Sequence, residues 1–200
     1  MAKAEWVQTS PSQGSGNGTV NVSSKTQYSG RVARQSVLTW KAANVDDVPR
    51  TVIQAGKPQF VDIDDAASAD KNGKVVTISG VTNSARLTFK LGTGELQVSL
   101  PSTYSANSVN TTNGAAISGD PGATAEFPFS ISIDVPGNDG TTSVSRQIIV
   151  EDEVGNRDVC LLTLAAGDAF ITIAEGPIEL DYLGTPVSVK VESNTNWTVE

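Results

Sequence analysis

Acidic side chains are the only residues in this sequence grouped closely enough to suggest chemistry. Glu151-Asp152-Glu153 could supply the carboxylate pair of a glycosidase, which places one carboxyl group on each side of the scissile bond. Neighbouring strand residues point to opposite faces, however, and this run precedes a Gly155-Asn156 turn. We therefore expect no catalysis from these residues.

A second acidic run comprises Asp62, Asp64, Asp65 and Asp70. Calcium takes six to eight oxygen ligands, so a calcium site is one reading of the run. The spacing fits no EF-hand loop, and Asp70-Lys71-Asn72-Gly73 is a good turn sequence in its own right. The sequence favours a solvated loop and predicts no metal and no cofactor.

The residue types needed for most other catalysis are absent or isolated. There is no histidine, which excludes Ser-His-Asp and Cys-His catalysis and histidine-ligated metal sites. Cys160 is the single cysteine, and its apolar neighbours Val159 and Leu161 predict a buried small side chain instead of a reactive thiol. The Gly14–Gly18 stretch is not a phosphate loop, because no Gly-Lys-Ser/Thr follows it. We expect a protein that is not an enzyme.

The elements that carry these residues are predicted to be strands. Short β-branched or alternating runs are separated by Gly, Pro and Asn turn clusters, and no apolar stripe of helical period competes with them. Many short strands of this kind predict an all-β, antiparallel β-sandwich fold. The expected strands cover residues 19–22, 36–40, 50–53, 74–78, 86–91, 95–100, 129–133, 147–150, 160–164 and 187–191.

Charge and hydropathy exclude several classes of partner. The chain has 200 residues and a formal net charge of −8, which argues against nucleic acid because phosphate binding needs a basic face. No run of about eighteen apolar residues predicts a membrane span. The segment Met1–Trp6 has no apolar core or cleavage site, so we expect synthesis in the cytoplasm without a signal peptide.

The sequence repeats itself with an offset of about 111 residues. Arg34-Gln35-Ser36-Val37-Leu38 matches Arg146-Gln147-Ile148-Ile149-Val150, where 146 − 34 = 112. Gly56 matches Gly167, and Thr82-Asn83 matches Ser193-Asn194, both at 111. Ser15-Gly16-Asn17-Gly18-Thr19 also resembles Ser118–Thr124, with two inserted residues.

This repeat predicts three units. Residues 57–167 form a complete sandwich, residues 1–56 correspond to the second half of a unit, and residues 168–200 correspond to the first half. The chain is therefore expected to carry one whole unit flanked by two complementary halves.

The matched residues also resemble a known family. Trp6–Pro11, Gly14–Gly18 and Val52-Ile53-Gln54-Ala55-Gly56 are similar to the second half of a BACON-type domain. Val187–Val191, Ser193-Asn194 and Trp197 are similar to the first half. The middle unit diverges from the pattern, with Arg86 where the tail has Trp197.

The resemblance implies an immunoglobulin-like sandwich from Bacteroidales or their phages. Short proteins of this type resemble virion decoration and fibre proteins of crAss-like tailed phages. We therefore expect a structural virion protein, made in the host cytoplasm, that decorates the capsid or attaches head fibres through contacts with capsid or other virion proteins and through self-association. The alternative is a carbohydrate-binding or adhesion module of a Bacteroidales or phage surface protein, which leaves a glycan as a possible partner.

Three aromatic residues are candidates for exposed contacts. Trp6 and Trp197 fall at core positions of the family and are expected to pack. Trp40 aligns with Asp152 at the offset of 112, a position expected to be accessible to water, and Tyr28 and Tyr104 lie in turn-rich segments. We expect Trp40, Tyr28 and Tyr104 to be exposed, with protein and sugar as equally good partners.

The two half units raise a question of pairing. A half sandwich exposes an apolar face and unpaired strand edges, which favours association. The halves could meet within one chain, between chains, or not at all, each half then forming its own small sheet or the tail docking on a capsid. Completion between chains is the expected arrangement, because the ends of such sandwiches usually lie at opposite poles.

Overall fold

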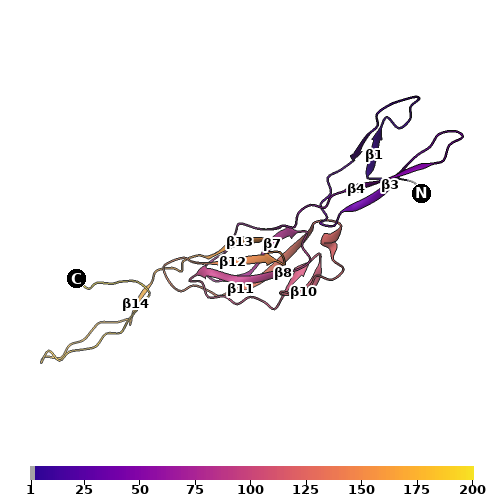
Figure 1. The fold of residues 1–200 in the computed structure, drawn as a ribbon. Helices are drawn as coiled ribbons and strands as arrows, with labels where there is room; N and C mark the ends of the chain where they lie inside the picture. Colours follow the sequence, from indigo (N-terminus) through magenta and orange to yellow (C-terminus); the bar gives the residue numbers. More distant parts are fainter. Residues whose placement is uncertain (1–2) are drawn as a thin grey trace.

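The computed structural model describes residues 3–200, and its regular secondary structure is almost entirely strand. Residues 61–164 hold two sheets packed face to face, with a pair of hairpin-like sheets before them and one two-stranded sheet after them (Figure 1). The all-β prediction is confirmed, and the middle of the chain is an antiparallel β-sandwich. Within the described residues there is no helix of the length and apolarity needed to cross a membrane.

The first sheet of the sandwich has five strands in the order β10-β9-β11-β7-β5. These strands are β5 (Val61–Ile63), β7 (Lys74–Thr82), β9 (Thr103–Ala106), β10 (Val109–Thr112) and β11 (Phe127–Val135). The second sheet has four strands in the order β6-β13-β12-β8. They are β6 (Ala66–Ala69), β8 (Leu87–Gly94), β12 (Val144–Asp152) and β13 (Arg157–Leu164), and a 3₁₀ turn η1 covers Pro121–Ala123. All pairs are antiparallel except β6 with β13, which is parallel.

Alternation of side chains builds the core between the two sheets. In β11 every second residue from Phe127 to Val135 is buried, while the residues between them face outward or are half-buried. The opposing sheet contributes Phe89, Ile148 and Leu162 to the same core. This regular alternation is the reason that the sequence pattern predicted these strands correctly.

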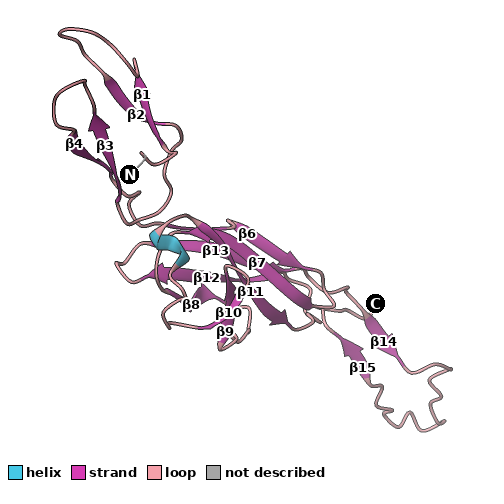
Figure 2. Cartoon of the chain, turned by 90° about the vertical axis from the view of Figure 1, so that its right-hand side faces the viewer, coloured by secondary structure: helices cyan, strands magenta, loops and turns pink. Residues whose placement is uncertain are grey.

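Four strands precede the sandwich and two follow it. β1 (Val7–Ser10) pairs with β2 (Asn21–Ser24), and β3 (Arg34–Trp40) pairs with β4 (Val48–Gln54). β14 (Ile171–Ile173) pairs with β15 (Val191–Ser193). Figure 2 shows these two groups at opposite ends of the sandwich.

The prediction of a strand at residues 95–100 is wrong. This segment has no ladder partner, although Leu96 is 2 % exposed and the amides of Glu95 and Leu96 both donate to the Ser145 carbonyl. Its apolar residues seal the edge of the core without extending a sheet. The strand expected at residues 187–191 is also displaced, since pairing there is confined to β15.

Candidate assembly interface

The three predicted contact aromatics have different environments. Trp40 is 41 % exposed, as expected. Tyr28 is half-buried, because the Arg34 guanidinium lies 4.4 Å from its ring centre and its hydroxyl lies 3.1 Å from the Ala123 carbonyl. The prediction of an exposed Tyr104 is wrong, since Tyr104 is 3 % exposed in β9.

Strand alternation explains the burial of Tyr104. Its ring points into the core and packs 5.0 Å from that of Phe89, and burial raises the pKa of Tyr104 to about 12. The turn-rich sequence around it hid the short strands β9 and β10, so the prediction of exposure failed.

The acidic run at the end of β12 is bound to neighbouring backbone and side chains. Asp152 is 7 % exposed and accepts hydrogen bonds from the Ser84 hydroxyl and from the amides of Val154 and Asn156. Glu153 accepts from the Ala85 amide at 3.0 Å. These carboxylates hold the turn after β12 in place, which is a structural role.

The Asp62–Asp70 run lies on loops and strand edges. Asp64 accepts a hydrogen bond from the Ser79 amide at 2.8 Å, and Asp70 accepts one from the Asn72 amide at 2.9 Å. Within residues 3–200 no three acidic or cysteine side chains lie close enough together to hold a metal ion. The expected turn at residues 70–73 is present.

Cys160 lies inside the sandwich, as its apolar neighbours predicted. It is fully buried in β13, and burial raises the pKa of its thiol to about 11. The protonated, inert form is therefore favoured at neutral pH.

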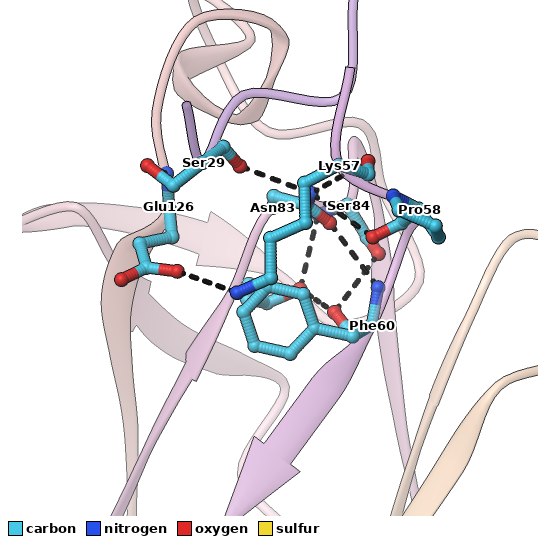
Figure 3. Close-up of polar contacts among 8 residues, drawn as sticks. Ser29, Lys57, Pro58, Phe60, Asn83, Ser84 and Glu126 are labelled. Atoms are coloured by element: carbon cyan, nitrogen blue, oxygen red, sulfur yellow. Dashed lines mark hydrogen bonds and ion pairs between the residues drawn. The ribbon is translucent and has the colours of Figure 1, made fainter. Parts of the chain in front are cut away.

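A buried asparagine anchors the N-terminal joint, which we define as residues 28–32, 57–60, 83–84 and 118–126. Figure 3 shows Asn83 among the backbone groups of this joint. Its amide nitrogen donates to the carbonyls of Ser29 at 3.2 Å and Pro58 at 3.3 Å, and its side-chain oxygen accepts from the Phe60 amide at 3.1 Å. Asn83 is 0 % exposed, so these bonds are shielded from water.

Surrounding contacts fix the joint further. Arg31 pairs with Asp120, and this hydrogen bond raises the pKa of the guanidinium. The amide of Lys57 donates to the Gly30 carbonyl at 2.9 Å, and the Lys57 ammonium pairs with Glu126 at 2.8 Å. The first hairpins are therefore bound to the sandwich at the end of β7.

The same arrangement recurs at the C-terminal joint, defined as residues 138–142, 167–170 and 193–195. Asn194 donates to the Asp139 carbonyl at 2.7 Å and the Asp168 carbonyl at 2.8 Å, and its side-chain oxygen accepts from the Phe170 amide at 3.0 Å. The Gly167 amide donates to the Gly140 carbonyl at 2.7 Å, as Lys57 does to Gly30.

The offsets between the two joints are nearly constant. From Phe60 to Phe170 the offset is 170 − 60 = 110, and from Asn83 to Asn194 it is 194 − 83 = 111. The hydrogen bonds thus follow the sequence repeat, which supports the repeat interpretation. The unit boundaries at 56/57 and 167/168 stay predictions.

The hairpin β3–β4 has the register of β12–β13. Arg34 pairs with Gln54 as Val144 pairs with Leu164, so the shifts of the two strands sum to 220. The flanking hydrogen bonds, Lys57 to Gly30 and Gly167 to Gly140, differ by 110 at both residues, so each strand shifts by 110. Trp40 therefore corresponds to the fully buried Val150. The expected alignment of Trp40 with Asp152 is wrong, because the sequence match at 112 is two residues out of register. The expectation that Asp152 is accessible to water is also wrong, since Asp152 is 7 % exposed.

Exposure of Trp40 has a simple structural cause. Trp40 shares a face with Leu38, which is 5 % exposed, and lies opposite Val48, which is 44 % exposed. Within residues 3–200 β3 and β4 pair only with each other, whereas β12 and β13 are flanked by β8 and β6. The β3–β4 hairpin therefore leaves the Trp40 and Val48 end of this face uncovered and both of its strand edges open.

Residues 168–200 expose apolar side chains that correspond to residues of the central sandwich. The Gly184 amide donates to the Asp181 carbonyl at 3.1 Å, as the Gly73 amide does to Asp70 at 3.0 Å, and both glycines have a φ of 72°. Because the two turns match, residues just before and just after Gly184 correspond to residues of the middle unit at an offset of 184 − 73 = 111. Ile178 and Leu180 then correspond to Ala67 and Ala69 of β6, and Val187 and Val189 correspond to Val76 and Ile78 of β7.

These counterparts differ sharply in burial. Val76 and Ile78 are at most 6 % exposed, whereas Val187 is 50 % and Leu180 is 65 % exposed. Trp197, expected to pack in a core, is 50 % exposed for the same reason, since no strand of the described chain covers this half. Trp6, also expected to pack, is half-buried, and the Arg34 guanidinium lies 4.5 Å from its ring centre.

The chain matches no protein-family model, and no curated protein shows significant similarity to it.

Proposed function

We propose that this protein is a non-enzymatic structural component of a virion, either a capsid decoration protein or a head-fibre attachment protein. It acts by surface contact and strand pairing, with capsid or other virion proteins as partners. The supporting observation is the exposed apolar side chains and open strand edges at each end of the central sandwich (Figure 1). Edges and apolar faces of this kind are strong sites for protein association.

The acidic residues support a non-catalytic role. Asp152 and Glu153 are bound to neighbouring backbone amides, and Glu151 pairs with Lys90 at 2.8 Å. The aromatic residues give the glycan alternative less support, because Tyr104 is buried and Tyr28 lies under Arg34. Trp40 alone of the three proposed contact residues is exposed.

The experiment is co-sedimentation of the purified protein with capsids of a Bacteroidales tailed phage, alongside a glycan array. Saturable binding to capsids without a glycan signal is the expected result. Glycan binding that Trp40→Ala abolishes, without capsid binding, would contradict the proposal and establish the carbohydrate-binding alternative.

A further inference from the structure

We propose that the last half unit of one copy completes the first half unit of a second copy, and that the Ser15–Thr19 loop of that second copy seals the new joint. This inference deepens the proposed structural role by naming the partner, a second copy of this chain. The uncovered halves, the two joints and the loop each contribute to it.

The strands of the two halves are complementary. In the middle unit β7 runs antiparallel beside β11, and β6 runs parallel beside β13. In the first half unit β4 is the counterpart of β13. β2 is the counterpart of β11, because β2 precedes the N-terminal joint as β11 precedes the C-terminal joint. The last half unit has the counterparts of β6 and β7. Residues 176–180 of one copy would therefore lie parallel to β4 of another, and residues 185–193 antiparallel to β2.

Completion within one chain is prevented by the positions of the joints. Asn83 directly follows β7, whereas Lys71, which pairs with Asp168 of the C-terminal joint, lies three residues before β7 begins. The two joints are thus separated by the length of a nine-residue strand, about 30 Å. Figure 2 shows the two half units on opposite sides of the sandwich. The contact between copies is therefore head-to-tail.

The loop at residues 118–124 shows how a joint is sealed. The Gly122 carbonyl accepts from the Arg31 amide at 2.9 Å, and a Cβ on Gly122 would lie 2.0 Å from the Asn83 carbonyl oxygen. The Ser15–Thr19 loop resembles this loop in sequence, and Gly16 shares the left-handed φ of Gly119, 67° against 73°. Gly18 is the counterpart of Gly122.

The C-terminal joint has a vacant place for such a loop. Thr141 corresponds to Arg31 at the offset of 110, it is exposed, and no described residue accepts a hydrogen bond from its amide. In the proposed complex the Gly18 carbonyl of the second copy accepts from the Thr141 amide. Gly18 itself then lies against the Asn194 carbonyl, as Gly122 lies against Asn83.

Charge matches across this contact. In the N-terminal joint Arg31 pairs with Asp120. Their counterparts are Thr141 on one side and Asn17 on the other, both neutral. Because neutral residues stand at both positions that correspond to the Arg31–Asp120 ion pair, the contact between copies buries no unpaired charge there.

Two glycine variants test the proposal, Gly18→Val inside the Ser15–Thr19 loop and Gly14→Val at the residue just before it. In the single chain a Cβ on Gly14 or on Gly18 meets nothing within 4 Å, and neither residue has a left-handed φ. Gly18→Val and Gly14→Val should therefore both fold with the melting temperature of the unmodified chain. Only Gly18→Val places a side chain against the partner's Asn194.

The measurement is sedimentation velocity over a range of concentrations, without capsids. The unmodified chain and Gly14→Val should associate in multiples of 20.8 kDa, and Gly18→Val should lower the association constant at least tenfold. A chain that stays at 20.8 kDa throughout, or equal association by the two variants, would overturn the inference.

A charge pair placed across the two copies provides the second test. Chains carrying Thr141→Arg alone and Asn17→Asp alone should associate with each other more tightly than either does with itself, and added salt should remove the difference. No preference between them would contradict the proposed joint. Because these assays contain no virion, their failure leaves capsid binding to be judged separately, and failure of capsid binding leaves self-assembly standing.

Discussion

At the scale of single residues, two asparagines control how the parts of the chain are joined. Asn83 satisfies four backbone groups in a site that excludes water, and the half-buried Asn194 bonds three backbone groups at the other end. Both asparagines belong to matched positions of the sequence repeat, Thr82-Asn83 and Ser193-Asn194. Their role as joint anchors could not be predicted, because it depends on carbonyls that lie far away in the sequence, such as that of Ser29.

Replacing Asn83 should destabilise the protein. Asn83→Ala removes the side chain that bonds the carbonyls of Ser29 and Pro58 and the Phe60 amide, so we expect a loss of about 2 to 3 kcal/mol in the free energy of unfolding. Urea denaturation measures this loss. Asn110→Ala is the control, since Asn110 is exposed in β10, and it should change stability by less than about 0.5 kcal/mol. Equal effects of the two variants would show that Asn83 is not an anchor.

Residue exposure was harder to predict from sequence than fold class. Tyr104 was expected on the surface because turn residues surround it, but strand alternation turns its ring inward. Trp40 was expected on the surface and is there, yet for a different reason: it occupies an inner-face position whose covering strands are missing from its own half unit. Exposure depends on the layer above a strand, which a local pattern cannot describe.

At the scale of elements, long and regularly alternating strands were predictable and short polar ones were not. β7, β11, β12 and β13 follow clear β-branched runs. The pattern does not predict β9 and β10, because Ser, Thr and Asn dominate these strands. It wrongly predicts a strand at residues 95–100, because the alternating apolar residues of this segment cover the edge of the core without joining a sheet. β15 is shorter than its counterpart β7 because a strand extends only where a neighbour supplies hydrogen bonds.

The middle unit should fold alone. Its core cluster runs from Ile63 to Leu164, so residues 57–167 contain every side chain of that core. We expect a single cooperative urea transition for this fragment, with coincident fluorescence and far-ultraviolet circular dichroism curves. Non-coincident curves or an insoluble product would show that the unit boundaries are misplaced.

At the scale of the whole molecule, the phase of the repeat determines the behaviour of the ends. The central sandwich holds its two flanking half units apart, and each half keeps apolar residues exposed that their counterparts in the middle unit bury. The sequence predicts the repeat, which the hydrogen bonds of the two joints support, and the complementary halves stay a prediction. It could not place the joints at opposite ends of β7, because that depends on the path of the chain through the folded sandwich.

Hydrogen exchange tests the central claim, completion of one copy by another, most directly. In the single chain the amides of residues 187–190 donate to no described residue, whereas β7 pairs with β11 along its length. When the protein is concentrated enough to associate, alternate amides in this segment should become protected, as in an antiparallel edge pairing. Association with these amides still exchanging at the rates of an unfolded peptide would contradict the account.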